Sequence, residues 1–330
     1  MKVAIVVLNW NGVQLLEKFL PSIVRFSGDA AIYVADNAST DNSIAYLREH
    51  FPTVNIVQND ANYGFAKGYN EALKHIEADI YALVNSDIEV TSEWLLPVIA
   101  KFKSDSDIAI IQPKILDYNN KAAFEYAGAA GGFIDKYGFP FCRGRIFDTI
   151  EIDTSQYDND VEIFWASGAC FFIRAKVFNE LGRFDDDFFA HQEEIDLCWR
   201  ARNASYKASF ISSSIVYHVG GATLQQGNPH KTYLNFRNSL FMLIKNLPAK
   251  KLYPILFGRM LFDGIAGIKF LLEVKPAHFY AILRAHFAMY RSFSKMKNKR
   301  QRLQRLDYYS IKSIVSSYYF ARKTKYNEMF

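Results

Sequence analysis

The chain has 330 residues, which is enough to bury one large core or two smaller ones. Half of the residues are hydrophobic and 16% are aromatic, which excludes a disordered chain. The three cysteines, Cys142, Cys170 and Cys198, lie far apart and form no CxxC pair. They argue against a disulfide framework and a zinc site, and for reduced thiols in a cytosolic compartment.

Charge is divided unevenly along the chain. Residues 1–245 hold 22 Lys and Arg against 30 Asp and Glu, a net charge of −8, and residues 246–330 hold 17 against 4, a net charge of +13. A basic segment of this kind usually meets nucleic acid or the anionic cytoplasmic leaflet of a membrane. No nucleic-acid-binding motif accompanies it, so we expect an anionic membrane surface and no nucleic acid as its partner.

Strands and helices alternate over the first 85 residues. Residues 2–9 form a β-branched apolar run without a small-residue cleavage site, so we expect a buried strand and no signal peptide. The other expected elements are helices at 13–26 and 64–76, a segment at 39–51 that starts with capping residues and continues as a helix, and strands at 30–36, 53–59 and 79–85. The connections are too long for hairpins, which predicts an α/β fold with a mostly parallel central sheet covered by helices.

Polar residues end all four predicted strands. They are Asn9 and Asn11, Asp36 and Asn37, Asn59 and Asp60, and Asn85 and Asp87. Ordinary turn chemistry explains any one strand that ends in this way. Four such ends at one edge of a parallel sheet describe a polar groove for a ligand rich in hydrogen-bonding groups.

The ligand of this groove is not cradled by glycines. The first strand is followed by NWNG instead of G-x-G-x-x-G, and the chain has no P-loop motif. A divalent cation, Mn²⁺ or Mg²⁺, is then the expected counter-charge for a diphosphate, with Asp87 as a hard oxygen ligand. One carboxylate is a weak metal signal, so further ligands should come from elsewhere in the chain.

The motifs VVLNWNG, VADNASTDNS, NYGFAKGYN and LVNSDIEV occur in that order, followed by FWASGACFFIRAKVFNELGRFDDDFFAHQEEIDLCWRAR and VYHVGGATL. In this combination the sequence resembles the family 2 glycosyltransferases, and most of all their rhamnosyltransferase-like branch. The resemblance covers roughly residues 1–245. It implies an inverting enzyme of the GT-A fold that uses a nucleotide-sugar donor.

The resemblance assigns donor contacts to the strand ends. The family's aspartate after the second strand contacts the donor base, and that position is Asp36, with Asn9 and Asn11 beside it. The family's D-x-D-like element falls on residues 85–87. Its first position here is an asparagine, so Asp87 is expected to hold the metal and Asn85 a ribose or phosphate oxygen.

For three further polar residues, a structural and a donor-binding interpretation both stay open. Asn62 and Asn70 are either helix caps or donor contacts. Lys67 either reaches a phosphate or is an exposed helical lysine. Asp41 is expected to be a cap or turn residue.

The second half of the chain should supply the general base. Glu193 and Glu194 open a predicted helix, where they are either a solvated helix start or the family's acidic pair. The family usually has Glu-Asp here with the second acid as base, which implies Glu194. Asp196 is a further candidate, although Arg200 lies four residues on and the two side chains should pair.

Additional candidate site residues follow, the metal role of His218 from the resemblance and the others from their own chemistry. His218 is either an ordinary histidine at a strand end or a second metal ligand, which suits Mn²⁺ better than Mg²⁺. Arg237 is either a helix-surface arginine or a clamp on the diphosphate. Trp165, Gly168 and Ala169 belong to a segment expected to line the acceptor or sugar pocket.

The sequence therefore predicts an inverting, metal-assisted transfer of a sugar from a dTDP- or UDP-sugar to a hydroxyl of a glycan, with a lipid-linked glycan as the expected acceptor. Two alternatives stay open. One is a catalytically inactive nucleotide-sugar-binding or membrane-peripheral scaffold protein. The other is a nucleotidyltransferase, although the Gly-rich, Arg-bearing loop of that class is missing after the first strand.

The domain organisation follows the charge. Residues 1–245 are expected to form the glycosyltransferase domain, with a donor half at 1–110 and an acceptor and catalytic half at 111–245. Residues 246–330 are expected to form a basic, amphipathic helical extension. Its apolar run at 252–272 is interrupted by Arg259, Asp263 and Lys269, which favours a helix in the membrane interface over a spanning one. A helix packed on the enzyme's own core is the alternative. We expect a cytoplasmic enzyme peripheral on the inner face of the membrane.

Overall fold

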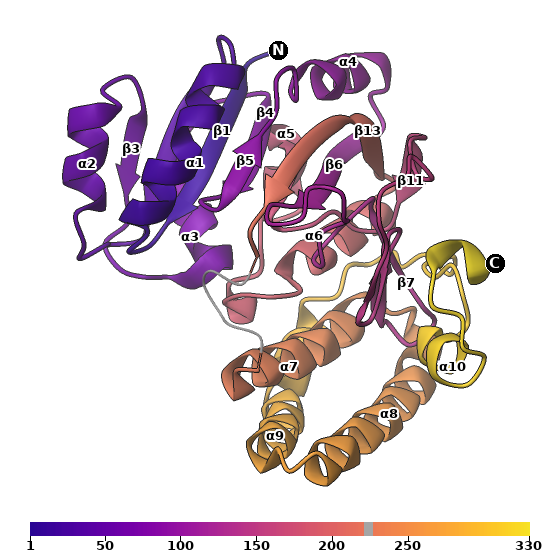
Figure 1. Cartoon of the computed structure of the whole chain (residues 1–330). Helices are drawn as coiled ribbons and strands as arrows, with labels where there is room; N and C mark the ends of the chain where they lie inside the picture. Colours follow the sequence, from indigo (N-terminus) through magenta and orange to yellow (C-terminus); the bar gives the residue numbers. More distant parts are fainter. Residues whose placement is uncertain (221–226) are drawn as a thin grey trace.

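A mixed β-sheet forms the centre of the computed structural model, which describes residues 1–220 and 227–330 (Figure 1). The strand order is β11-β13-β6-β12-β4-β1-β2-β3, and β5 pairs with β13. The strands are β1 (Val3–Asn9), β2 (Ala31–Asp36), β3 (Asn55–Gln58), β4 (Ile80–Asn85), β5 (Ile88–Val90), β6 (Ile108–Asp117), β11 (Val161–Ile163), β12 (Cys170–Arg174) and β13 (Lys207–His218). The end of the VYHVGGATL motif, at 221–224, lies outside the described residues.

The predicted parallel arrangement is confirmed at the four strands nearest the N-terminus. β1 runs parallel to both β2 and β4, and β2 runs parallel to β3. β12 is inserted antiparallel between β4 and β6, and β13 is again parallel to β6. The sheet is therefore mostly parallel, and the carboxyl ends of β1, β2, β3 and β4 share one edge.

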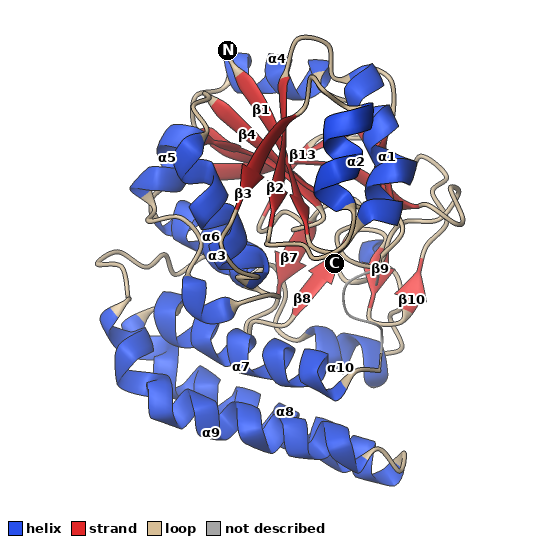
Figure 2. Ribbon diagram, turned by 90° about the vertical axis from the view of Figure 1, so that its left-hand side faces the viewer, coloured by secondary structure: helices blue, strands red, loops and turns tan. Residues whose placement is uncertain are grey.

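Helices cover both faces of this sheet (Figure 2). The helices of the first two-thirds of the chain are α1 (Val13–Phe26), α2 (Ser43–His50), α3 (Gly64–Ala72), α4 (Leu96–Ser104), α5 (Ala175–Glu180) and α6 (Glu193–Asn203). Alternate residues of β1 enter two different cores, with Ile5 and Val7 in the cluster that includes α1 and Ala4 and Val6 in the cluster that includes α3. All three cysteines are buried free thiols.

The segment 39–51 starts with polar turn residues and continues as a helix, as predicted, and this helix, α2, runs from Ser43 to His50. The side chain of Asp41 accepts a hydrogen bond from the Ser43 N–H at 3.0 Å, so it caps the helix from outside. The same carboxylate accepts from the Val13 N–H at 3.0 Å and so also serves the first turn of α1. The expected cap or turn role of Asp41 is confirmed.

A second, antiparallel sheet was not predicted from the sequence. Its strands are β7 (Gly132–Ile134), β8 (Pro140–Cys142), β9 (Arg145–Ile146) and β10 (Thr149–Ile150). The end of the chain returns to this sheet, because the Ile314 N–H, at the start of α10 (Ile314–Tyr319), donates to Asp135 at 3.0 Å. Ile314 also packs with Phe141 in a small core. Such short strands and long-range contacts carry little periodic signal.

Three long helices form a layer beyond the carboxyl edge of the sheet. They are α7 (Pro229–Asn246), α8 (Leu252–Leu272) and α9 (Pro276–Asn298). α7 packs against α6 and α9, whereas α8 and α9 form the outer part of the layer (Figure 1). Within residues 1–220 and 227–330, no helix has the length and apolar character needed to cross a bilayer.

A glycine in the small sheet tests the packing between the two sheets. Gly132 lies against the buried Trp165, where a Cβ would come within 2.1 Å of the indole ring. Gly132→Ala should therefore lower the free energy of unfolding by about 2–3 kcal/mol, measured by denaturant titration. Gly264→Ala in α8 is the control, because a Cβ there meets nothing within 4 Å. Equal unfolding curves for the two variants would contradict this packing.

Candidate active site

The pairing of two distant strands brings Asp87 and His218 together. β5 follows Asp87 directly and pairs with the end of β13, with Ile88 opposite His218. The Nε2 atom of His218 lies 3.2 Å from Oδ1 of Asp87, and both side chains are buried. The two predicted metal ligands are 131 positions apart in the chain, and they therefore lie next to each other at the edge of the sheet.

Glu125 is the second carboxylate beside His218, and it was not predicted from the sequence. Its Oε1 lies 3.2 Å from the Nδ1 atom of His218, on the side of the ring away from Asp87. Gly220, with a φ of +71°, leaves room for this carboxylate, since a Cβ there would lie 3.2 Å from Glu125 Oε1. Burial alone would lower the pKa of His218, but Glu125 and Asp87 raise it to about 10.

This arrangement fits a divalent cation with two protein ligands. In the described ranges 1–220 and 227–330, no three His, Cys, Asp or Glu side chains group as a complete metal site. A carboxylate and an imidazole are suitable ligands for Mn²⁺, and a carboxylate behind the imidazole is a common way to orient such a ligand. The remaining positions would have to be filled by the ligand's own oxygens and water.

The predicted base-binding residues form one hydrogen-bonded group at the ends of β1 and β2. Asn9 Nδ2 donates to Asp36 Oδ1 at 2.9 Å, and the Ser39 hydroxyl donates to the same oxygen at 2.5 Å. The Ser39 N–H donates to Asp36 Oδ2 at 2.9 Å. Ser39, which sequence reasoning did not single out, thus holds the buried carboxylate with Asn9 and leaves it spare lone pairs.

Asn11 shapes the loop beside this group. It has a φ of +50°, a conformation that asparagine tolerates better than most residues. Its side-chain oxygen accepts from the Thr40 N–H at 2.7 Å, and its own N–H donates to the Ser39 hydroxyl at 2.8 Å. Asn11 is exposed and keeps its side-chain NH₂ at the edge of the groove.

Asn62 lies two residues before α3, and Lys67 and Asn70 lie within it. The Asn62 side chain accepts from the Gly64 N–H at 3.0 Å and so forms a turn just before the helix. Lys67 extends over the Tyr63 ring, with Nζ 3.8 Å from its centroid. Asn70 is buried and donates to the Phe184 carbonyl at 2.9 Å, so it joins α3 to the second half of the chain.

The segment expected at the acceptor pocket divides into two parts. The Asn85 N–H donates to the Ala169 carbonyl at 2.9 Å, so this segment adjoins the tip of β4. A Cβ on Gly168 would lie 3.7 Å from the carboxyl carbon of Glu194. Trp165 instead is buried, with its indole N–H donating to the Phe133 carbonyl at 2.9 Å. Its indole is therefore occupied inside the core, and only Gly168 and Ala169 adjoin the groove.

Glu193 and Glu194 open α6 as predicted, with Glu193 buried and Glu194 half-buried. Burial raises the pKa of Glu194 to about 7. Burial and then the charge of Glu194 raise the pKa of Glu193 well above its usual range. One carboxyl oxygen of each residue has no hydrogen-bond partner within the described part of the chain. Two adjacent carboxyls with raised pKa values, one of them near neutral pH, are an arrangement suited to proton transfer.

Asp196 lies in an ion-pair network. Its Oδ2 is 2.8 Å from Arg200 Nε and 2.7 Å from Lys245 Nζ, and its Oδ1 accepts from Asn246 Nδ2 at 2.8 Å. Burial opposes the charge of this carboxyl, but Lys245 and Arg200 hold its pKa below the usual range. The expected pairing with Arg200 is confirmed, and both oxygens of Asp196 are occupied.

A strained loop sets the position of the two glutamates. Phe189, His191 and Gln192 all have positive φ values, of 62°, 70° and 72°. Asn238 on α7 holds the loop by donating to the carbonyls of Phe188, Ala190 and His191 at 2.9, 2.9 and 2.7 Å. Asn238 was a candidate in the sequence together with Arg237, but its role in holding this loop depends on contacts that the sequence does not show.

Arg237 contributes to the same loop. Its guanidinium donates to the Asp187 carbonyl at 3.0 Å and the Phe188 carbonyl at 3.1 Å. Its Nε donates to the Asn238 side chain at 2.8 Å. The structure thus gives Arg237 a positioning role in the loop, and its Nη1 is the group left for an anionic ligand.

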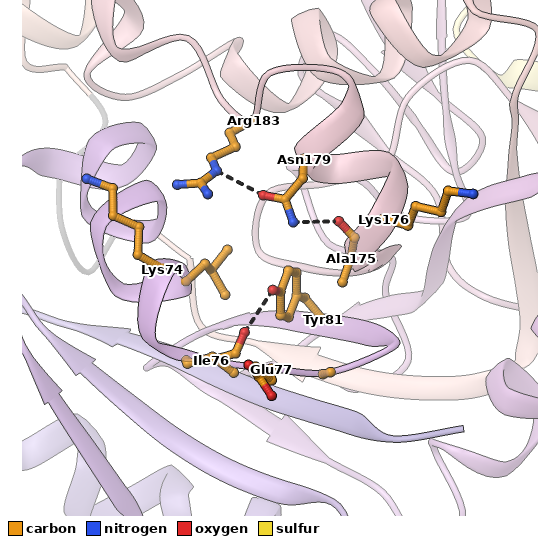
Figure 3. A pocket seen from close by; sticks show the side chains of 10 residues that line it. Lys74, Ile76, Glu77, Tyr81, Ala175, Lys176, Asn179 and Arg183 are labelled. Carbon is orange, nitrogen blue, oxygen red and sulfur yellow. Dashed lines mark hydrogen bonds between the residues drawn. The ribbon is translucent and has the colours of Figure 1, made fainter.

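The cavity of Figure 3 is separate from this groove. It has a volume of about 340 Å³ and lies at the amino end of β4, between Tyr81, Lys74 and Arg183. Its hydrogen bonds are internal, since Arg183 donates to Asn179 at 2.9 Å and Tyr81 to the Ile76 carbonyl at 2.9 Å. Ligands of open α/β sheets bind at the opposite, carboxyl end of the strands.

The sheet, its polar edge and the helix that opens with two acids define a glycosyltransferase of the GT-A fold. The chain belongs to glycosyl transferase family 2. The sequence model of this family matches residues 4–182, which are more than half of the 330 residues. It is therefore an enzyme of the transferase class, and the resemblance seen in the sequence is confirmed. The nucleotidyltransferase alternative is set aside.

Two relatives show the breadth of this similarity. The chain is 23% identical over 273 residues to the low-salt glycan biosynthesis hexosyltransferase Agl10 of Haloferax volcanii, covering 78% of this chain and 83% of the relative. It is 21% identical over 218 residues to the N-acetylglucosaminyl-diphospho-decaprenol L-rhamnosyltransferase of Mycobacterium tuberculosis, covering 62% of this chain and 71% of the relative.

Solved structures share the fold at low sequence identity. The mannosyltransferase PcManGT from Pyrobaculum calidifontis, in complex with GDP-Man and Mn²⁺, has a TM-score of 0.53 at 15% identity, covering 89% of this chain and 75% of that one. Residues 1–349 of S. aureus TarS, in complex with UDP-GlcNAc, have a TM-score of 0.56 at 15% identity, covering 90% and 91%. These similarities establish the GT-A fold.

The strained loop gives a prediction. Asn238→Ala removes the side-chain NH₂ group whose two hydrogens serve these three carbonyls, and the Ala190 and His191 carbonyls lose that donor, so the free energy of unfolding should fall by about 2–3 kcal/mol. Hydrogen exchange of residues 187–192 should accelerate more than that of the sheet, measured by mass spectrometry. Asn235→Ala, on the same helix, removes the same amide group without touching these carbonyls and is the control. Unchanged exchange in Asn238→Ala would refute the role of this residue in holding the loop.

Proposed function

We propose that the protein is an inverting glycosyltransferase that moves a sugar from a UDP- or dTDP-sugar to a hydroxyl of a lipid-linked glycan. The observation that carries the proposal is the turn at Gly168 and Ala169. On one side it accepts a hydrogen bond from the N–H of Asn85 at the donor strand ends, and on the other it lies against Glu194. The strand ends proposed to bind the donor and the carboxyl group of Glu194, whose pKa is about 7, therefore both adjoin the turn at Gly168 and Ala169.

The donor would bind along the ends of β1, β2 and β4. Asp36, oriented by Asn9 and Ser39, accepts the N3–H that uracil and thymine both present. Asn11, Asn62 and Lys67 line the loops beside it, and Asn85 is suited to a ribose or phosphate oxygen. The UDP-GlcNAc complex of TarS supports a uridine donor, whereas the GDP-Man complex of PcManGT shows that this fold also takes guanine.

Asp87 and His218 would hold a divalent cation, with Mn²⁺ favoured by the imidazole ligand. When bound, the cation supplies positive charge for the diphosphate leaving group. Glu125 fixes the orientation of His218, and the β5–β13 pairing fixes the distance between the two ligands. Mn²⁺ in the PcManGT structure supports this assignment.

Glu194 is the proposed general base, and the neighbouring Glu193 has a pKa that burial and then the charge of Glu194 raise. Glu194 removes the proton of the acceptor hydroxyl as the oxygen attacks the anomeric carbon, with inversion at that carbon. Asp196 serves by anchoring α6, since its oxygens are occupied by Arg200, Lys245 and Asn246. Gly168 and Ala169 leave space for the acceptor beside the base.

The acceptor and location are proposed from the relatives and the charge. The mycobacterial relative is named for a diphospho-decaprenol substrate, which supports a lipid-linked acceptor for this chain. The net charge of +13 in residues 246–330, from 17 basic and 4 acidic residues, favours a place on the inner, anionic face of the cytoplasmic membrane. We also propose the division into a glycosyltransferase domain at 1–245 and an extension at 246–330.

The metal assignment predicts a loss of donor binding. Asp87→Asn should abolish turnover and the Mn²⁺-dependent part of UDP binding together, because it removes a charged ligand while keeping the side-chain shape. Calorimetric titration of UDP with and without Mn²⁺ measures this loss. Glu89→Gln is the control, since Glu89 lies two residues further on and forms an exposed pair with Lys121. Full activity of the wild-type protein in excess chelator would sink the metal assignment.

The base assignment predicts a pH profile. Because Glu194 must be deprotonated to act and its pKa is raised to about 7, log kcat/KM should climb with pH below that value and level off above it. Glu194→Gln should lower turnover by about 10²-fold or more and leave donor affinity nearly unchanged.

The same assay separates an enzyme from an inactive binding protein. Release of nucleoside diphosphate from UDP- or dTDP-sugars in the presence of acceptor is expected for the wild-type protein only. If Glu194→Gln retained turnover and Glu193→Gln or Asp196→Asn lost it with an intact fold, the base would be misassigned. If the wild-type protein bound the donor without any turnover, a binding role would replace the proposal.

A further inference from the structure

We propose that the outward face of the α8–α9 hairpin lies flat in the headgroup region of an anionic membrane. This apolar face is made by α8 side chains spaced three or four residues apart: Tyr253, Phe257, Leu261, Ile265, Ile268 and Leu272. The inference deepens the proposed function, on which it rests for its purpose, because it says how the enzyme would meet a lipid-linked acceptor.

The apolar face is long and carries no charge over most of its length. Phe257 is 65% exposed, Ile265 64% and Leu272 80%. Among the exposed residues of α8, no charged one precedes Lys269. At about 1.5 Å per residue the stretch from Tyr253 to Ile268 is about 22 Å long. Soluble monomers rarely expose a continuous apolar strip of this kind.

The polarity of α8 is the reverse of that of a helix on a water-facing surface. Its charged residues Arg259 and Asp263 are buried and paired at 2.8 Å. The neighbouring helices provide further partners for both side chains, since Arg259 donates to Ser239 at 2.7 Å and His286 Nε2 lies 3.1 Å from Asp263. A helix with buried charges and an apolar outer face matches an environment less polar than water.

The neighbouring helix α9 adds aromatic and basic side chains. Its exposed aromatic residues are Tyr280, Phe287 and Tyr290, and Arg284 and Arg291 are exposed between or beside them. Aromatic rings and arginines with apolar stems are the side chains preferred at the boundary between headgroups and acyl chains. No described helix can span a bilayer, so the hairpin would lie in the plane of the surface.

Charge favours a membrane over a second copy of the chain. The exposed acidic residue of residues 252–298 is Glu273, and it is already paired with Lys275 at 2.8 Å. Glu273 also lies 3.7 Å from Lys269. Two copies face to face would bring Arg284 and Arg291 against one another without acidic partners, whereas anionic headgroups complement both.

The orientation suits the proposed reaction. β1 begins at the end of the molecule far from α8 and α9 and runs toward the helical layer, so the polar strand ends face the same side as the hairpin (Figure 1). Docking through the hairpin would turn the groove of Asp36, Asp87 and Glu194 toward the surface that carries the acceptor. The loop end of the hairpin, with Leu272 and Val274 at 80% and 85% exposure, would enter the interface too.

The test is vesicle flotation of the full-length protein at low salt. We expect binding to phosphatidylcholine vesicles that contain phosphatidylglycerol, and weaker binding to phosphatidylcholine alone. The variant Leu261→Glu/Ile265→Glu should lose at least about tenfold in partition to the anionic vesicles, because two apolar side chains no longer insert. Arg291→Glu should weaken binding to the anionic vesicles and leave binding to the neutral ones unchanged.

Leu96→Glu is the matched control. Leu96 is 61% exposed on α4, at the opposite end of the molecule, so the same change should leave flotation unchanged. The proposal is overturned if the wild-type protein fails to float with anionic vesicles, or if Leu96→Glu reduces flotation as much as the α8 variant. It is also overturned if light scattering shows a dimer that Leu261→Glu/Ile265→Glu dissociates and vesicles bind neither form. UDP binding, measured in parallel without lipid, reports on the proposed function separately.

Discussion

The rest of the structure depends on the ion pairs of the Asp196 carboxylate with Arg200 and Lys245. This carboxylate is fully buried and paired with Arg200 on its own helix and with Lys245 on α7. Lys245 also binds Asp185 at 2.7 Å, and Asp185 binds Lys299 just beyond α9 at 2.5 Å. Removing one partner from such a buried group leaves an uncompensated charge, which is far more costly than losing a surface pair. Helix α6, the loop before it and the helical layer are therefore held as one unit.

This unit holds the start of α6, where Glu193 is buried and Glu194 is half-buried beside a strained loop. Burial is the main cause of the raised pKa values of both carboxyls. The strain at Phe189, His191 and Gln192 persists because Asn238 and Arg237 bind the loop carbonyls. The fold thus places rigid structure behind the groups that need a fixed geometry and a low local polarity.

The helical layer also connects the groove with the surface of the molecule. Its inner side carries the buried pair of Arg259 and Asp263, and its outer side carries the apolar face of α8. The sequence predicted the limits of this helix, 252–272, because an apolar run of that length has few other solutions. It did not predict which side of the helix faces outward, because the partners of Arg259 and Asp263 come from α7 and α9.

The sequence by itself determined the parallel strands, the polar edge and the family, because alternating periodicity and strand-end residues are local patterns. The helix expected at 13–26 has those limits in the structure, and Asp36 meets Asn9 as neighbouring parallel strands require. Only the tertiary structure decided the roles of Ser39, Glu125 and Asn238, and the burial of Trp165 in the core. Each depends on a contact between segments far apart in the chain. Such contacts depend on which strands pair and which loops meet. They cannot be predicted from the residues next to a side chain in the sequence.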